Sequence, residues 1–161
     1  MVLCVTATIC AGAQTTPLPA ATPPAAPATP QAPCLFTPEE LEPVLARRPA
    51  AGVARRDARG SACVYAMPTQ DVRQVVVLVD ERYTAERFEQ RVSLAGRLAA
   101  SPPTMIRKVG DGAFYVAGVA GARRGMKYVE ITGLRQSAAR VVTAEDAARL
   151  LGLALARLPQ F

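Results

Sequence analysis

The stretch ACVYAMPTQDVRQVVVLV, residues 62–79, decides how the folded part of this chain is built. Residues 62–67 are apolar and partly β-branched and predict a strand, which Pro68 ends because proline cannot donate to a strand ladder. Residues 69–71 suit a turn. Residues 72–79 contain the run VVVLV, which is typical of a central buried strand. The sequence therefore predicts a hairpin at the middle of a sheet.

A helix is predicted directly after this hairpin, over residues 85–99, with Thr84 as its N-cap. Apolar residues recur there at helical spacing, so one side of the helix is expected to face the core. That side is predicted to consist of Phe88, Val92, Ala95, Leu98 and Ala99.

The C-terminal part predicts a second hairpin and a last helix. Residues 113–120 and 126–132 have strand patterns, and GARRG at 121–125 is predicted to be the turn between them. The final helix is predicted over 144–158, capped by Thr143. Its expected core residues are Ala147, Leu150, Leu151, Ala154 and Leu158.

Upstream of the first hairpin, a short helix is predicted over residues 38–47. Thr37 suits an N-cap, Pro38 the first helical position, and Glu40 completes a capping box. Residues 48–61 lack periodicity and predict a loop.

The predicted elements follow one another in the order α-β-β-α-β-β-α. Two hairpins can pair into one antiparallel sheet, so the predicted fold class is α+β, with about four strands and helices on one face. The folded unit is expected to be a single domain over residues 34–161, which is long enough to bury its own core.

The N-terminal third differs from the rest in composition. Residues 1–13 are apolar and end in Ala-Gly-Ala, which predicts a signal peptide with cleavage before Gln14. Residues 14–33 are rich in Pro and Ala and predict a semi-rigid, extended linker. We therefore expect a periplasmic or secreted protein, with membrane contact only through an uncleaved or lipidated N-terminus.

Two of the four cysteines, Cys34 and Cys63, lie in the expected mature protein. An even count in an exported domain predicts a disulfide. A metal pair or redox couple would favour a short spacing such as Cys-x-x-Cys, and these two are far apart. The chain has no His, the commonest zinc ligand, so no metal and no cofactor is expected.

Charge points to a basic surface without a specific polyanion partner. The formal net charge is +6, from 19 basic and 13 acidic residues. The basic residues are scattered among acids, which favours a solvated surface over a nucleic-acid site. No nucleic-acid partner is expected.

Candidate site residues lie around the second predicted hairpin. Arg123, Arg124 and Lys127 can hold an anionic group, although a solubilising hairpin tip explains them more simply. Tyr128 and Glu130 point the same way from one strand and can line a sheet surface, or can form an exposed polar pair. No catalytic residue is assigned, because a nucleophile would lack the usual His base.

Three short motifs have a familiar arrangement: CLFTPEE at 34–40, CVY at 63–65 and VGDGAFY at 109–115. In this respect the chain resembles a family of small exported bacterial proteins and lipoproteins of unknown function. Those proteins share a Cys-Leu-x-Thr-x-x-Glu helix start, a second Cys at a strand start and a Gly-Asp-x-Ala-aromatic turn. This chain departs at Phe36, where a second Leu is usual, and at Gly112, an insertion in the turn. The resemblance implies an exported, disulfide-linked α+β domain and implies no activity.

Together these patterns predict a non-catalytic binding module of the cell envelope. Its ligand is expected to be an envelope protein or a small anionic molecule, held on an uncovered sheet face or at the basic hairpin. The alternatives are an assembly factor that binds protein partners and a hydrolase that uses carboxylates such as Asp111 or Glu130.

Overall fold

The computed structural model describes residues 34–57, 60–68, 74–134 and 141–158. The predicted signal peptide (1–13), the predicted linker (14–33) and the predicted turn at 69–71 lie outside these residues.

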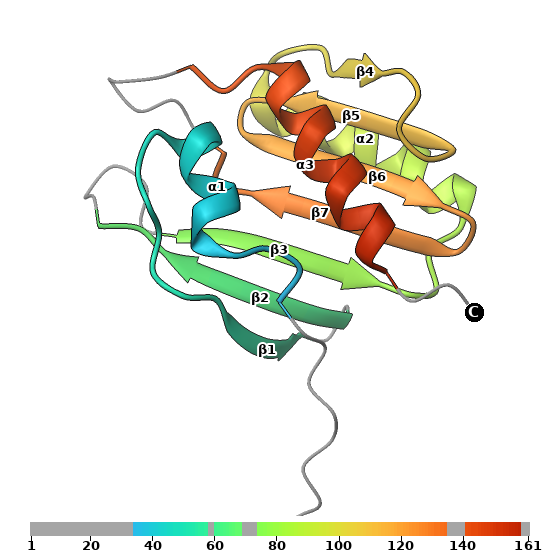
Figure 1. The fold of residues 1–161 in the computed structure, drawn as a ribbon. Coiled ribbons are helices and arrows are strands. Elements are labelled where there is room, and N and C mark those ends of the chain that lie inside the picture. The colour runs from blue at the N-terminus through green and yellow to red at the C-terminus, as the bar shows by residue number, and fades with distance from the viewer. Residues whose placement is uncertain (1–33, 58–59, 69–73, 135–140, 159–161) are drawn as a thin grey trace, which may run out of the picture.

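An antiparallel sheet forms the centre of the fold, in the order β1-β2-β3-β7-β6-β5-β4 (Figure 1). The run VVVLV lies in β3, which pairs with β2 on one side and β7 on the other. The seven strands of the described residues are β1 (Val53–Asp57), β2 (Gly60–Ala66), β3 (Gln74–Asp80), β4 (Thr104–Ile106), β5 (Gly112–Val116), β6 (Val119–Arg124) and β7 (Lys127–Thr132).

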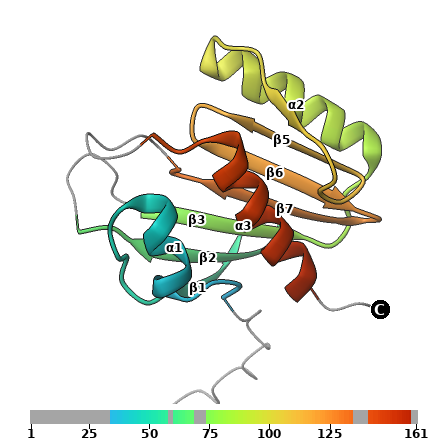
Figure 2. The ribbon, with the colours of Figure 1, turned by 45° about the horizontal axis from the view of Figure 1, so that its top comes forward.

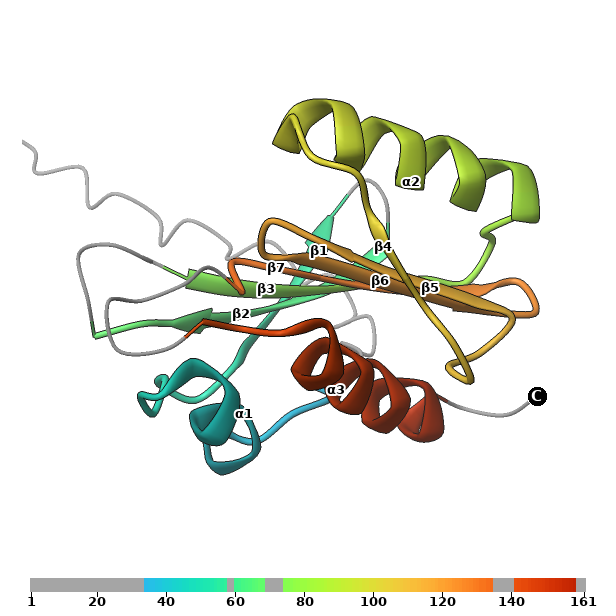
Figure 3. The same ribbon diagram turned by 90° about the horizontal axis from the view of Figure 1, so that it is seen from above.

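In the described part of the chain, three helices lie on the two faces of this sheet: α1 (Pro38–Leu45), α2 (Ala85–Ala99) and α3 (Ala144–Arg157). With the sheet seen on edge, α1 and α3 lie on one side and α2 on the other (Figure 3). We call the first side the closed face and the second the α2 face. The turned view shows α2 above β5 and β6, away from β1 and β2 (Figure 2).

The predicted fold is therefore right in being an antiparallel α+β arrangement and wrong in three respects. The sheet has seven strands rather than about four, helices cover both faces rather than one, and the element order is α-β-β-β-α-β-β-β-β-α. One missed strand is β1, which lies inside the predicted loop 48–61. Its two consecutive arginines interrupt the alternation of apolar and polar residues that predicts a strand. The other is the three-residue β4.

The second predicted hairpin is misplaced by several residues. Residues 113–120 do not form one strand, because the chain reverses between Val116 and Val119, which face each other across β5 and β6. The two turn residues, Ala117 and Gly118, have φ angles of 45° and 84°. Two positive φ angles match the twist of the strands, and this usually requires Asn-Gly or Gly-Gly. Consequently residues 121–124 continue β6 instead of forming the turn.

The helices begin at their predicted caps. Thr84 Oγ1 accepts a hydrogen bond from Arg87 N, and Thr143 Oγ1 accepts one from Asp146 N. At α1, the Glu40 carboxylate accepts from Thr37 N at 2.9 Å, as a capping box requires. The predicted bounds of α2 are confirmed, and α1 and α3 end one or two residues early.

The core is largest on the closed face. Val75 and Val77 of β3 and Val129 and Ile131 of β7 lie there, with at most 1% of each residue exposed. Helices α1 and α3 contribute their apolar stripes to the same cluster, and the stripe predicted for α3 is confirmed. Among the described residues no helix is long and apolar enough to cross a membrane.

Candidate functional site

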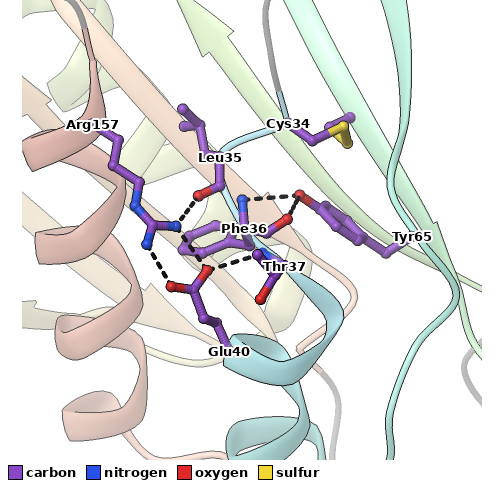
Figure 4. The surroundings of a disulfide bond; sticks show 8 residues. Cys34, Leu35, Phe36, Thr37, Glu40, Tyr65 and Arg157 are labelled. Atoms are coloured by element: carbon purple, nitrogen blue, oxygen red, sulfur yellow. Dashed lines mark hydrogen bonds and ion pairs between the residues drawn. A yellow bond between two sulfur atoms is a disulfide. The ribbon is translucent and has the colours of Figure 1, made fainter.

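The start of the domain is fastened to the closed face by the predicted disulfide. Cys34 and Cys63 are bonded, with Cα atoms 5.4 Å apart. Figure 4 shows Tyr65 beside them: its hydroxyl donates to Phe36 O at 2.9 Å and accepts from Phe36 N at 3.1 Å. A buried phenol that bonds both backbone groups of one residue holds the segment before α1 in a single position.

Arg157, near the end of α3, completes this arrangement. Its guanidinium donates to Leu35 O and to both carboxylate oxygens of Glu40 (Figure 4). The hydrogen bonds from Arg157, and next that from Thr37 N, lower the pKa of Glu40 to about 2. These polar groups satisfy one another, so the corner they form is structural.

The predicted basic hairpin is only partly available to a ligand. Arg123 NH1 donates to Gly125 O at 2.6 Å and lies 3.6 Å from the Asp111 carboxylate. Asp111 in turn accepts from Gly125 N at 2.7 Å, so it fastens the hairpin to the start of β5. Arg124 is exposed and Lys127 is half-buried.

These basic residues are also split between the faces of the sheet. Arg123 faces Tyr128 across β6 and β7 and shares its face, whereas Arg124 and Lys127 form the next pair and belong to the other side. The structure therefore does not gather the three cations into one patch.

Tyr128 and Glu130 point the same way, as predicted, but they are buried under α2, so the expectation of an exposed pair is wrong. The Tyr128 hydroxyl donates to Glu130 Oε2 at 2.6 Å. Arg91 of α2 donates to both carboxylate oxygens, from Nε and from NH2, each at 2.6 Å. We call Arg91, Tyr128 and Glu130 the Glu130 cluster.

A second layer of side chains surrounds the Glu130 cluster. Tyr83 stacks on Tyr128, with ring centroids 4.1 Å apart and planes 10° from parallel. Arg87 lies over the Tyr83 ring, with its guanidinium carbon 4.7 Å from the centroid. The same guanidinium is 3.7 Å from the carboxylate of Asp80, at the end of β3.

Gly121 of β6 makes room for this cluster. A Cβ atom at this position would lie 2.5 Å from the Tyr128 hydroxyl oxygen and 2.6 Å from a ring carbon of Phe114. Both are far inside van der Waals contact, so any larger residue would displace one of the two rings.

The electrostatics of the Glu130 cluster favour a fixed ion pair over acid–base chemistry. Hydrogen bonding to Glu130 raises the pKa of Arg91, and burial, followed by the charge of Glu130, raises the pKa of Tyr128. Both residues therefore keep their protons, and the carboxylate accepts three hydrogen bonds. A general base must come within hydrogen-bond reach of its substrate, and the Glu130 carboxylate is buried under α2.

Next to the cluster, none of the helices of the described residues covers the part of the α2 face over β1 to β3. Strand pairing places Val53, Val64 and Val76 in one cross-strand row and puts Leu78 in the row of Glu130. Val53 is 58% exposed, and Val64, Val76 and Leu78 are half-buried. On the closed face, by contrast, the neighbouring Val75 and Val77 are covered. We call Val53, Val64, Val76 and Leu78 the open strip.

The side of α2 toward the open strip has its own exposed apolar residues. Arg87, Arg91, Leu94 and Leu98 recur at intervals of four, three and four, so they form one stripe, which we call the α2 flank. Arg91 contacts β7 and Arg87 contacts the end of β3, so this stripe faces the uncovered strands. Leu94 is 41% exposed and Leu98 is 75% exposed.

Sequence reasoning missed this surface because it assigned Leu98 to the buried side of α2, and that assignment is wrong. The signal was the 87–91–94–98 stripe, in which two arginines are followed by two leucines. Arg91 was likewise missed as the partner of Glu130. Among the described residues no group of three or more Cys, Asp or Glu side chains is placed to hold a metal ion.

Comparison with models of known protein families and with curated proteins finds no match for this chain. The resemblance to small exported bacterial proteins therefore stays a prediction that depends on the three short motifs.

Proposed function

We propose that the chain is an exported, non-catalytic binding module of the cell envelope, and that it binds its ligand on the open strip and the α2 flank. The observation that carries this proposal is that α2 buries the apolar side chains of β5, whereas those of β1 to β3 on the same face of the sheet are partly exposed. Helix α2 buries Phe114 and Val116 of β5, while Val53, Val64 and Val76 remain partly in water. Contiguous exposed apolar surface is typical of interaction sites.

The location in the periplasm or outside the cell is part of the same proposal. The Cys34–Cys63 disulfide supports it, because disulfides persist in oxidising compartments. The composition of residues 1–33 supports it as well, since an apolar segment followed by a Pro/Ala-rich one fits a signal and a linker.

A non-catalytic role is supported by the state of the carboxylates. Glu130 is buried and accepts hydrogen bonds from Arg91 and Tyr128, and Asp111 accepts from Gly125 N beside Arg123. Each of these two acids thus has a structural role in the fold.

Site-specific photo-crosslinking in the producing cells tests the proposal. A benzophenone side chain at position 98 is expected to give one discrete adduct, and Leu94→Asp is expected to abolish it. The matched control carries the probe at Met126, which is 54% exposed on the hairpin between β6 and β7. Equal adducts from both positions, or none from position 98, would contradict the proposal.

A further inference from the structure

Helix α2 is held to the sheet by fewer buried side chains than the other two helices of the described residues. Two of its 15 residues, Phe88 and Ala95, are buried. Helix α3 has five buried residues of 14, and α1 has three of eight. Segments with few buried apolar side chains open at a lower free-energy cost than the rest of a fold. Helix α2 is therefore the most weakly packed of the three.

The core beneath α2 is separate from the core on the closed face. None of its buried members belongs to the cluster that α1 and α3 cover. These members are Tyr83, Phe88, Ala95, Phe114, Val116 and Tyr128. Helix α2 can therefore leave the sheet without removing any buried side chain from the larger core.

Phe88 is the large apolar side chain by which α2 contacts the sheet. Its ring meets Phe114 and Tyr128 edge-on, with centroid distances of 5.9 Å and 6.2 Å. It also lies over Gly112 of β5, where a Cβ atom would be 2.9 Å from a ring carbon of Phe88. The docked position of α2 is therefore specific, but it depends on a single buried side chain larger than alanine.

The bidentate ion pair of Arg91 and Glu130 also holds α2, but it adds little to the cost of opening. Most of the attraction in a buried pair offsets the cost of removing both charges from water. When α2 leaves the sheet, both charges return to water together, so neither stays buried and unpaired. Arg87, which lies 3.7 Å from the Asp80 carboxylate, has a side chain that is 49% exposed, so this contact is weak in water.

The connections at the two ends of α2 permit this movement. Residues 81–84 and 100–103 lie outside helices and strands. At the first connection Tyr83 N donates to Met126 O at 2.8 Å, so Tyr83 stays on the sheet and the hinge follows it. At the second, Ser101 N donates to a carbonyl oxygen of α2, so the hinge lies between Ser101 and β4.

We propose that α2 is a hinged cover, which leaves the sheet as one unit while the closed face stays folded, and that the Glu130 cluster is its latch. Opening exposes Phe114, Val116 and Tyr128, which lie on the same face as the open strip. The exposed apolar surface then extends from β1 to β5. This device goes beyond the proposed function and does not depend on the identity of a ligand.

Native-state hydrogen exchange of the oxidised, full-length chain, followed by NMR at low urea, tests this proposal. An undocked helix of 15 residues is marginal in water, so the amides of α2 report its opening. They are expected to exchange about thirtyfold faster, or more, than the protected amides of α3 and β3. Their rates should also depend less on urea, because opening α2 exposes less surface than unfolding the whole domain.

A matched pair of mild substitutions on β7 separates the two faces. Ile131→Val removes one methylene from the closed face, and Tyr128→Phe removes one hydrogen bond from the α2 face. Because the closed face stays packed while α2 is open, Ile131→Val is expected to accelerate exchange in α3 about fivefold and to leave α2 within about twofold. Tyr128→Phe is expected to accelerate exchange in α2 about fivefold.

Two results would overturn the inference: equal exchange rates in α2 and α3, or equal acceleration of both helices by Ile131→Val. Either would show that α2 opens only when the whole domain unfolds. An unchanged rate in α2 of the Tyr128→Phe variant would exclude the Glu130 cluster as the latch.

Discussion

The two faces of the sheet are closed by different means. On the closed face, α1 and α3 cover apolar side chains completely, and a disulfide and Arg157 fasten the segment before α1. On the α2 face, helix α2 lies above β5 and β6 (Figure 2), and aromatic contacts and a buried ion pair hold it there. The comparison indicates that stability is concentrated on the first face, and that the second retains surface for a partner.

Removal of the disulfide is expected to have the largest effect on this comparison. In the chain-entropy model a bridge across 29 residues stabilises by about 3–4 kcal/mol. The double variant Cys34→Ala/Cys63→Ala should lose this amount in urea denaturation. Dithiothreitol should destabilise the wild type equally and leave the variant unchanged. A loss below about 1 kcal/mol would show that the helices hold this face without the bridge.

Disruption of the Glu130 cluster should come next and should act on the other face. Glu130→Gln keeps the size of the side chain but leaves the guanidinium of Arg91 without an anion. We expect a loss of about 2–3 kcal/mol, below the range for a fully buried pair because the Arg91 side chain is 18% exposed. Hydrogen exchange should accelerate in α2 more than in α3. Tyr128→Phe, which removes one hydrogen bond, should cost only about 1 kcal/mol.

Acid should weaken the Arg157 contact on the closed face. Because the pKa of Glu40 is lowered to about 2 in the folded chain, this contact stabilises fully above the ordinary value near 4.5. The contribution, about 1 kcal/mol for a partly exposed pair, is lost as the pH falls from 4.5 towards 2. Arg157→Met should remove that part of the acid dependence in urea titrations at pH 6 and pH 2.5. An unchanged dependence would exclude this pair as its source.

The smallest effect is expected at the proposed binding surface itself. Leu98→Ala should change the free energy of unfolding by less than about 0.5 kcal/mol, because the side chain is already 75% exposed. Leu151→Ala is the matched control in α3, since Leu151 is 0% exposed, and it should cost roughly 3 kcal/mol. Similar losses in thermal unfolding would show that Leu98 packs in solution.

Helix caps and the alternation of residues along strands were sufficient to predict the elements in which these local patterns are strong. The caps at Thr84 and Thr143, the run VVVLV and the spacing of Tyr128 and Glu130 were all interpreted correctly. The disulfide was predicted from cysteine count and context, and it is present.

Weak signals explain the errors. Strand β1 lies at the edge of the sheet and shows little alternation of apolar and polar residues, because an edge strand is less buried than a central one. Charged residues on an edge strand also discourage aggregation. The turn at Ala117 and Gly118 lacks the usual Asn-Gly pair, so two strands looked like one. Together with the missed three-residue strand β4, these errors reduced the expected sheet from seven strands to four.

The sequence by itself determined the elements whose cause is local: helix caps, the buried central strand and the side of each strand that a residue faces. Only the tertiary structure decided which face α2 covers, that Arg91 meets Glu130 across 39 residues, and that Leu94 and Leu98 stay in water. The physical reason is that caps and alternation are set by neighbours along the chain. The burial of each sheet face, by contrast, depends on which helices pack on it. Within the described residues, three helices leave part of a seven-stranded sheet exposed.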